Sequence, residues 1–534
     1  MNQVMFSGRI LLLGYGGVAR CTLPLLLRHL AMPPGQITVL DMAEFGPVSE
    51  EALAQGVRFE RARITRRNLE HEILSRIGSG DLLVDLAWNI SCVELLTLCR
   101  RNNIRYINTS VELWDPYAGA ELLPPSDKTL YVRHMEIREL VRNWGNNSGP
   151  TAVLDHGANP GLVSHFTKRG LIDIAQKLRD EHPADPRLPA IDLAQEQRQF
   201  NELARLLGVK VIHVSEVDTQ VGRLPRRYGE FLNTWSVEGF YEESIAPAEM
   251  GWGSHERRLP FDAHTHDTGP RNQICLDRFG MDTFVRSRVP SGEMTGMIIR
   301  HGEAFSISDY LSVCDDAGRV LYRPTVHYAY CPCDAALESI EELRENGYPP
   351  PSDWRIMSDE LVSGRDELGC LLMGHDFKSW WTGTILDLAE SRELVPAQNA
   401  TTLQVASSVV AAVMWMLRNP RSGVRLPDEL PFDEILDFAA PYLGQIVSQP
   451  IDWMPEEPRG SRARLPVTHD AHWQFACFEV PEPPQPSRRT SPRTGRSATS
   501  RTIPTSEREI VPAGVVQPHG SKSESIPTDL PAEG

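Results

Sequence analysis

The chain has 534 residues and a formal net charge of −17, with 41% hydrophobic and 23% charged residues. This composition predicts a soluble globular protein of two or three domains, and the acidic balance disfavours nucleic acid and membrane surfaces as partners. The nine cysteines show no framework spacing, which predicts reduced thiols in a cytoplasmic protein.

A glycine-rich loop follows the first predicted strand. The apolar run 10–13 leads directly into Gly14-Tyr15-Gly16-Gly17-Val18-Ala19, a helical stretch reaches about residue 30, and a second strand over 37–40 ends at Asp41. This order predicts a dinucleotide-binding βαβ unit whose helix N-terminus binds the pyrophosphate. A carboxylate at Asp41 favours NAD over NADP, because it would repel a 2′-phosphate. The alternative is an ordinary strand–helix turn without a nucleotide.

The alternating pattern continues through the first 150 residues. Strands are predicted over 82–86 and 105–108, with a helix over 91–100 between them, which indicates a parallel sheet covered by helices. Ligands of such sheets bind beyond the carboxyl ends of the strands. We therefore expect Ala87, Asn89 and Thr109 to contact the cofactor.

A second region begins near residue 151. Predicted strands over 209–217, 294–300, 304–308 and 326–330 lack regular intervening helices, which favours an α+β domain with a mixed or antiparallel sheet. A helix over 398–417 is expected to return to the nucleotide domain. Its apolar run, 405–417, is too short to span a bilayer and predicts a buried helix.

Four domain segments are predicted from these patterns. They are a nucleotide domain over 1–150 completed by the helix 398–417, a substrate and dimerisation domain over 151–397, a C-terminal part over 418–479 packed on the core, and a tail over 480–534. The tail contains no aromatic residue, so it is predicted to be disordered.

Five segments carry a family resemblance. Besides Gly14–Ala19, they are HGANPG at 156–161, NTWSVEGFYEE at 233–243, RHGE at 300–303 and DELG at 366–369. Together they resemble the bacterial homospermidine synthases of the saccharopine-dehydrogenase-like group, over about residues 8–475. The resemblance implies an α/β fold with a Rossmann domain and an α+β substrate and dimerisation domain, a homodimer, and NAD kept as a prosthetic group. The implied reaction converts two putrescine molecules to sym-homospermidine and ammonia, with spermidine as a further aminobutyl donor.

The resemblance also implies a set of pocket residues. They are Glu112, Asn159, Glu216, Trp235, Glu243, His301 and Asp366, with Asn159 also near the cofactor. Such residues suit a diamine, because buried ammonium groups need opposite charges or a π face. Glu216, between apolar neighbours on a predicted strand, is the strongest acidic candidate from its sequence position alone.

Each candidate also has an ordinary structural alternative. These are a core position for Trp235, a helix cap for Glu112, a satisfied core histidine for His301, a surface turn for Asp366, and a solvated helix face for Glu238, Glu242 and Glu243. No lysine lies within the motifs, which disfavours an enzyme Schiff base, although Lys210 lies near Glu216 in sequence.

Two other functions remain open. One is a net dehydrogenase of the saccharopine or carboxyspermidine type, for which Arg133, Arg223 and Arg300 could clamp a substrate carboxylate. The other is a non-catalytic NAD-binding regulatory protein. The segment 262–267 contains Asp and His residues but no third ligand cluster, so no metal site is predicted.

Overall fold

The computed structural model describes residues 3–43, 50–116, 119, 122–456, 471–481 and 483. The predicted tail over 480–534 lies almost entirely outside these residues. Two large sheets organise the described part of the chain.

The first sheet has seven parallel strands in the order β24-β8-β7-β6-β2-β4-β5. Their bounds are β2 Ile10–Leu13, β4 Ile37–Asp41, β5 Arg58–Arg61, β6 Leu82–Asp85, β7 Arg105–Asn108, β8 Gly149–Val153 and β24 Ser422–Arg425. All residues of β2 are buried, as expected for a central parallel strand with helices on both faces. The order reverses around β2, which is where such sheets bind nucleotides.

Five helices belong to the N-terminal part of this sheet. They are α1 Gly17–His29, α2 Glu50–Ala54, α3 Leu69–Leu74, α4 Cys92–Arg101 and α5 Leu130–Asn143. Ser91 begins α4 by accepting a hydrogen bond from Glu94 N, so the helix predicted over 91–100 is confirmed with its N-cap.

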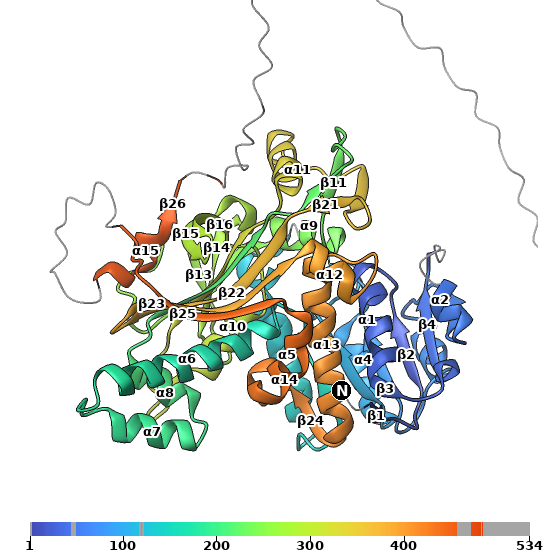
Figure 1. Cartoon of the computed structure of the whole chain (residues 1–534), viewed down its shortest axis with the longest axis horizontal. Helices are drawn as coiled ribbons and strands as arrows, with labels where there is room; N and C mark the ends of the chain where they lie inside the picture. Colours follow the sequence, from blue (N-terminus) through green and yellow to red (C-terminus); the bar gives the residue numbers. More distant parts are fainter. Residues whose placement is uncertain are drawn as a thin grey trace, which may run out of the picture. The chain divides into compact units, whose positions relative to one another are not determined.

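Helix α13, Ala400–Arg418, packs against α1, as predicted for 398–417 (Figure 1). It is long and apolar enough to cross a membrane, contrary to the length inferred from 405–417, but it is buried inside the fold. Asn399 caps it in a capping box with Thr402. The Asn399 amide also donates to Thr234 O at 2.7 Å, so the start of α13 is fixed to the segment that precedes Trp235.

The second sheet is mixed, as predicted for an α+β region. Its main path is β13-β14-β12-β19-β9-β22-β23-β25; off this path, β16 pairs with β19, β15 with β16, and β26 with β15. The bounds are β9 Val211–Asp218, β12 Pro247–Gly251, β13 Ala263–Thr265, β14 Gln273–Phe279, β15 Phe284–Val289, β16 Gly292–Met297, β19 Thr325–Cys331, β22 Arg365–His375, β23 Lys378–Asp387, β25 Gln445–Ile451 and β26 Glu479–Val480. Strands β9 and β19 pair in parallel at its centre, and β22 pairs antiparallel with β9.

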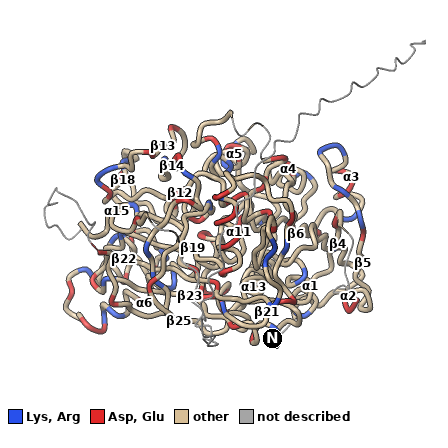
Figure 2. Tube along the Cα trace, turned by 90° about the horizontal axis from the view of Figure 1, so that it is seen from above, with Lys and Arg blue, Asp and Glu red and all other residues tan. Residues whose placement is uncertain are grey.

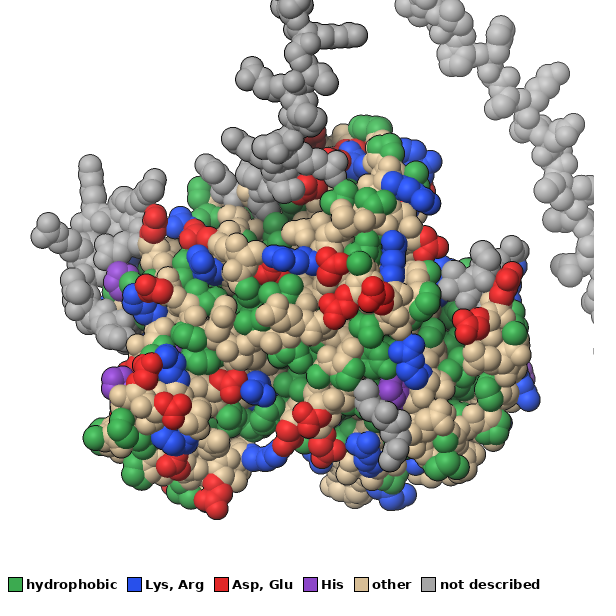
Figure 3. Space-filling model, viewed as in Figure 1, with side chains coloured by type: hydrophobic (Ala, Val, Ile, Leu, Met, Phe, Trp, Pro, Cys, Tyr) green, Lys and Arg blue, Asp and Glu red, His purple; other side chains and the backbone are tan. Residues whose placement is uncertain are grey.

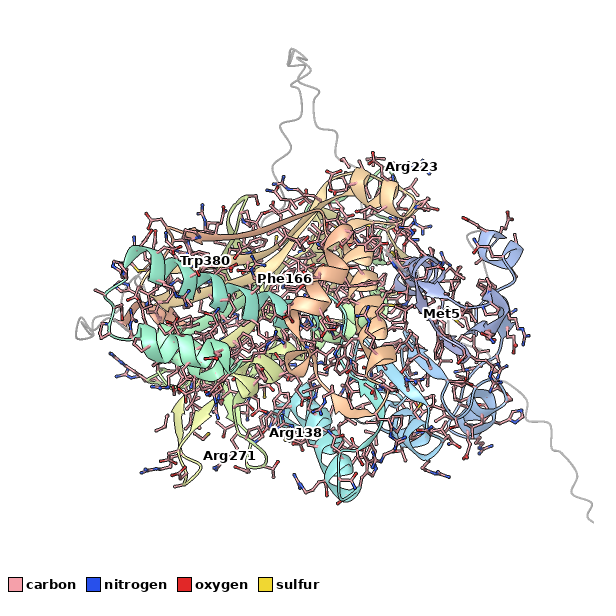
Figure 4. All side chains as sticks on the ribbon, turned by 60° about the horizontal axis from the view of Figure 1, so that its bottom comes forward. Met5, Arg138, Phe166, Arg223, Arg271 and Trp380 are labelled. Carbon is pink, nitrogen blue, oxygen red and sulfur yellow. The ribbon has the colours of Figure 1, made fainter. Side chains whose placement is uncertain are left out.

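Helix α6, Leu162–Glu181, packs against β22 and β23. Its Phe166 is fully buried, and Figure 4 labels this residue together with Trp380 of β23. The remaining helices are α7 Leu188–Glu196, α8 Phe200–Leu207, α9 Val237–Ile245, α10 Glu303–Tyr310, α11 Asp334–Glu345, α12 Leu388–Leu394, α14 Phe432–Ala439 and α15 Phe475–Phe478.

Four small two-stranded pairs complete the fold. They are β1 Val4–Met5 with β3 Leu30–Ala31, β10 Val221–Gly222 with β21 Leu361–Ser363, β11 Glu230–Asn233 with β20 Asp353–Ile356, and β17 Val313–Cys314 with β18 Val320–Tyr322. Acidic and basic residues are interspersed along the trace in Figure 2 and over the face drawn in Figure 3.

Two predicted strands differ from the structure. Residues 304–308 form part of α10 rather than a strand, and all five are buried. A short apolar run of this kind has no periodicity that distinguishes a buried helix from a buried strand. The strand predicted over 294–300 ends at Met297. Residues 298–301 leave the sheet, and this departure brings Arg300 and His301 to the pocket described below.

Candidate active site

Two adjoining pockets lie at the carboxyl ends of the seven-stranded sheet. The larger one is lined by Gly14, Gly16, Gly17, Val18, Ala19, Asp41, Ala87, Asn89 and neighbouring residues. These are predicted cofactor residues, and the sheet reverses its order here, so this pocket is the candidate dinucleotide site.

The glycine-rich loop has the geometry of a phosphate cradle. Gly14 adopts a φ of +79°, where a Cβ would also meet Leu86 O at 2.7 Å, whereas a Cβ on Gly16 would meet open space. Gly16 is the N-cap of α1 and carries no side-chain cap, and the first turn has no acidic residue. The N–H groups that begin α1 are therefore available for a pyrophosphate.

Asp41 ends β4 at the edge of this pocket. Its carboxylate accepts hydrogen bonds from Tyr15 N at 2.6 Å and Ala43 N at 2.7 Å. Tyr15 contributes this backbone group, while its buried ring packs on Phe59. The two N–H donors fix the carboxylate beside the glycine loop, where a ribose would lie.

The second pocket shares Val18, Leu86, Ala87, Trp88 and Ser236 with the first. A dinucleotide in the first pocket therefore has room to reach the second with one end. Six of the seven predicted pocket residues line the second pocket, namely Glu112, Asn159, Glu216, Trp235, Glu243 and His301, together with Thr109.

The loop 156–161 presents Asn159. Gly157 N donates to Pro160 O at 2.7 Å, and Gly161 has a φ of +133° at which a Cβ would overlap Gly157 O. His156 is fully buried and contacts His165 and Ser408 through its two ring nitrogens. Because these contacts anchor the loop to α6 and α13, the loop holds Asn159 at the pocket wall.

Glu216 on β9 is a pocket carboxyl group held by two hydrogen-bond donors. Its Oε2 accepts hydrogen bonds from Asn159 at 2.9 Å and from the Tyr328 hydroxyl at 2.5 Å. Burial, together with the nearby Asp218 carboxyl, raises the pKa of Glu216 to about 7 despite these two donors. The group therefore exchanges a proton near neutral pH.

Asp366 does not line the pocket. It is fully buried on β22, beside Glu216 and Asp218 of β9, and its Oδ2 accepts a hydrogen bond from Thr401 at 2.6 Å. Burial and the two neighbouring carboxyls raise the pKa of Asp366 well above its usual value. The surface-turn alternative is therefore wrong for Asp366, which is a buried carboxyl close to Glu216.

His301 lies between two acidic side chains. Its Nε2 is 2.8 Å from Glu243 Oε2, and its Nδ1 is 3.4 Å from Glu303 Oε1. Although burial lowers the pKa of His301, Glu243 and Glu303 outweigh it and hold that pKa well above the usual value. His301 is therefore a cation paired with Glu243.

A second ion-pair group lies beside the first. Glu242 accepts hydrogen bonds from Arg300 and, at 2.7 Å, from Arg133, and all three side chains are buried. The solvated-face alternative is therefore wrong for Glu242. Glu112 accepts from Ser110 through Oε1, and burial followed by the Glu242 charge raises the pKa of Glu112 to about 7.

Trp235 is half-buried and faces the pocket. Its indole N–H donates to the Tyr330 hydroxyl at 3.0 Å, and its ring packs edge-on against Phe240. Because the N–H already has an acceptor, the ring offers the pocket its π face.

Several pocket residues were not among the sequence candidates. Tyr328, Trp88 and Glu242 are the main ones, and Glu303, which does not line the pocket, pairs with the pocket residue His301. The sequence signal for Glu242 and Glu303 was their place in the NTWSVEGFYEE and RHGE segments, whereas Tyr328 lies in a plain apolar strand. No lysine lines the pocket in the part of the chain that the structure describes, and Lys210 directly precedes β9, where its N–H donates to Met373 O.

The acidic and histidine segment 262–267 is engaged in other contacts. His264 pairs with Asp277 at 2.6 Å, Asp262 pairs with Arg278 at 3.1 Å, and His266 stacks on Tyr131. Within the described ranges, no group of three His, Cys, Asp or Glu side chains is arranged to hold a metal.

This fold and site define a Rossmann-type, dinucleotide-dependent enzyme with an acidic and aromatic substrate pocket. Models of the saccharopine dehydrogenase NADP binding domain and C-terminal domain match residues 10–153 and 157–451. Homospermidine synthases from Blastochloris viridis and Mesorhizobium japonicum are 38% and 37% identical to the chain, over 88% of it and 96% of each relative. The crystal structure of the Legionella pneumophila homospermidine synthase in complex with NAD aligns with a TM-score of 0.77 and 34% identity, covering 90% of this chain and 99% of that one. The chain belongs to the saccharopine dehydrogenase family and, within it, to the homospermidine synthases.

Asp41→Ala should weaken retention of NAD, because the ribose loses its carboxylate partner and the glycine loop loses the acceptor of Tyr15 N. We expect a decrease of about tenfold or more in NAD affinity, in line with the loss of a charge-assisted hydrogen bond. The measurement is the NAD content of the purified protein and the dissociation constant after removal of NAD. Unchanged NAD occupancy would remove Asp41 from the ribose site.

Proposed function

We propose that this protein is an NAD-dependent homospermidine synthase that transfers an aminobutyl group from one putrescine to another and releases ammonia. The observation that carries the proposal is the pocket of Glu112, Glu216, Glu243 and Trp235, which adjoins the dinucleotide site. The relatives named homospermidine synthase support the same activity.

The charges of the pocket favour a diamine over a carboxylated substrate. A dehydrogenase of the saccharopine type needs arginines that can clamp carboxylates. Arg133 and Arg300 line this pocket, but both already pair with Glu242, and Arg223 does not line it. The remaining carboxyl groups and the Trp235 face suit ammonium groups, whose burial requires opposite charge.

Bound NAD supplies the acceptor and later the donor of one hydride, so the overall transfer is redox-neutral. Before hydride loss, the reacting ammonium must give up a proton. Glu216, with its pKa near 7, is placed to accept this proton and to return it to the departing ammonia. Asn159 and Tyr328 keep the Glu216 carboxyl oriented throughout.

Trp235 stabilises the cationic iminium that hydride loss leaves on the aminobutyl carbon. The second putrescine amine adds to this carbon, ammonia departs, and reduction of the new iminium gives homospermidine. The mostly apolar walls beside Trp235 limit water, which would otherwise hydrolyse the iminium. Glu243, held by His301, and Glu112 bind the ammonium groups that do not react.

The finer properties of this activity follow from the resemblance. We infer that the enzyme works as a cytoplasmic homodimer, that it keeps NAD bound between turnovers, and that spermidine also serves as an aminobutyl donor. Each can be checked with the purified protein, by its mass in solution and by the products formed from each donor.

Incubation of the purified protein with putrescine and NAD should give homospermidine and ammonia in equal amounts without lasting NADH. Polyamines, ammonia and absorbance of NADH are followed together. Accumulation of NADH without a new polyamine would favour the net dehydrogenase, and NAD binding without turnover would favour a regulatory protein.

Replacement of Trp235 separates a cation–π role from packing. The interaction is worth about 0.5–2 kcal/mol, so Trp235→Ala should lower kcat by about 2- to 30-fold more than Trp235→Phe, which keeps a ring. Steady-state kinetics with putrescine measures both. An equal loss in the two variants would contradict the cation–π role.

The pH dependence tests Glu216 and Glu112. Both carboxyls protonate as the pH falls through about 7, while putrescine stays a dication, so kcat/KM should fall by up to about 100-fold per pH unit at low pH, tenfold for each group. In Glu216→Gln, kcat/KM should be lower at every pH, and it should fall by only about tenfold per pH unit. The exposed-site variant Glu434→Gln is the control and should keep the wild-type slope. An unchanged slope in Glu216→Gln would exclude this titration.

A further inference from the structure

One carboxylate, Glu242, holds two arginines in the wall of the substrate pocket. Arg133 donates to Glu242 Oε1 at 2.7 Å, and Arg300 donates to the same oxygen. The three side chains are each less than a tenth exposed, and all line the pocket. The wall therefore contains two buried guanidinium groups that share one partner.

The remaining contacts leave this group little freedom. Arg133 also donates to Val111 O at 2.9 Å, and Arg300 to Lys128 O at 3.0 Å. The Trp88 indole donates to the second oxygen of Glu242 at 3.2 Å. Burial alone would raise the pKa of Glu242, but Arg300 and Arg133 bring it down to about 2. Glu242 is therefore ionised over the whole working pH range.

We propose that Glu242 is a specificity-determining residue that makes the pocket reject diamines bearing a carboxylate, such as α-amino-acid diamines, while admitting plain diamines. The inference rests on the proposed diamine activity, because it concerns the same pocket. Without Glu242, Arg133 and Arg300 would form a buried clamp of the kind that binds carboxylates.

The physical reason is a penalty against the wrong ligand. Ornithine is putrescine with one carboxylate on a terminal carbon, so its two amines reach the same groups. Its carboxylate could pair with Arg133 or Arg300 only by displacing Glu242, which would leave a buried carboxylate unpaired. Without displacement, the ligand carboxylate would meet Glu242 and Glu112 at close range. Either arrangement discriminates through repulsion rather than through a better fit to putrescine.

The neighbouring ion pair explains why ammonium binding and carboxylate rejection can be assigned to different residues. Glu242 and Glu243 are adjacent on α9, and Arg300 and His301 are adjacent beyond β16, so two pairs form side by side. Glu243 with His301 is left to bind ammonium. Glu242 occupies one donor group of each arginine, so a ligand carboxylate cannot reach those donors. Replacement of Glu242 by Gln removes the only negative charge of the three side chains and frees these donors.

The test is calorimetric titration of the NAD-bound protein with ornithine and with putrescine, compared between wild type and Glu242→Gln. Wild type should bind putrescine and show no measurable ornithine binding. In Glu242→Gln, ornithine affinity should rise at least tenfold and ornithine should compete with putrescine. Glu242→Asp keeps the charge and should still reject ornithine, and Glu434→Gln, which alters an exposed Glu–Arg pair, should behave as wild type.

Glu242→Gln with NAD and putrescine bound but no gain in ornithine affinity would overturn the proposal. If this variant does not retain NAD, the double variant Arg133→Gln/Glu242→Gln keeps the local net charge and leaves Arg300 without its carboxylate. It must bind ornithine more tightly than wild type, or the proposal is wrong. These experiments compare binding, so their outcome does not depend on whether wild type makes homospermidine. Failure of wild type to make homospermidine would refute the proposed function separately.

Discussion

The pairing of the α9 carboxylates with Arg300 and His301 is the interaction on which the pocket depends. Glu242 and Glu243 are carried by one helix, and their partners by the segment that leaves the second sheet after Met297. Each pair buries charge that would otherwise be too costly to remove from water. The pairs also divide the pocket wall into a region where two arginines share Glu242 and a region where His301 faces the two acidic side chains Glu243 and Glu303.

A second set of buried acids supports the chemistry from the sheet side. Glu216 and Asp218 lie on β9, and Asp366 lies opposite them on β22. Burial raises the pKa values of all three carboxyls, and neighbouring carboxyls raise those of Glu216 and Asp366 further. Asn159 and Tyr328 select which oxygen of Glu216 is occupied. The sheet thus supplies a proton-exchanging group without a histidine or a lysine in that position.

The two sheets meet through elements that are distant in sequence. Helix α13 packs against α1 of the first sheet and also contacts β22 of the second. Its Asn399 fixes the segment before Trp235, and its Ser408 contacts His156 of the loop that carries Asn159. Strand β24 then joins the edge of the first sheet. The relation between cofactor pocket and substrate pocket therefore depends on one returning helix.

The sequence by itself determined the local units. The glycine-rich loop, Asp41 at a strand end and the parallel strand pattern specify a dinucleotide site because their spacing follows from strand and helix geometry, and the family motifs named six residues that line the pocket. Only the tertiary structure decided the pairing of charges. Glu242 and Glu243 look alike in sequence, yet Glu242 pairs with two arginines and Glu243 pairs with His301, while Asp366 does not line the pocket. Tyr328 carries no local signal at all. These ion pairs and hydrogen bonds join residues that are far apart in the chain. Their energies depend on how deeply the side chains are buried and how they are oriented, and both are set only when the strands and helices pack together.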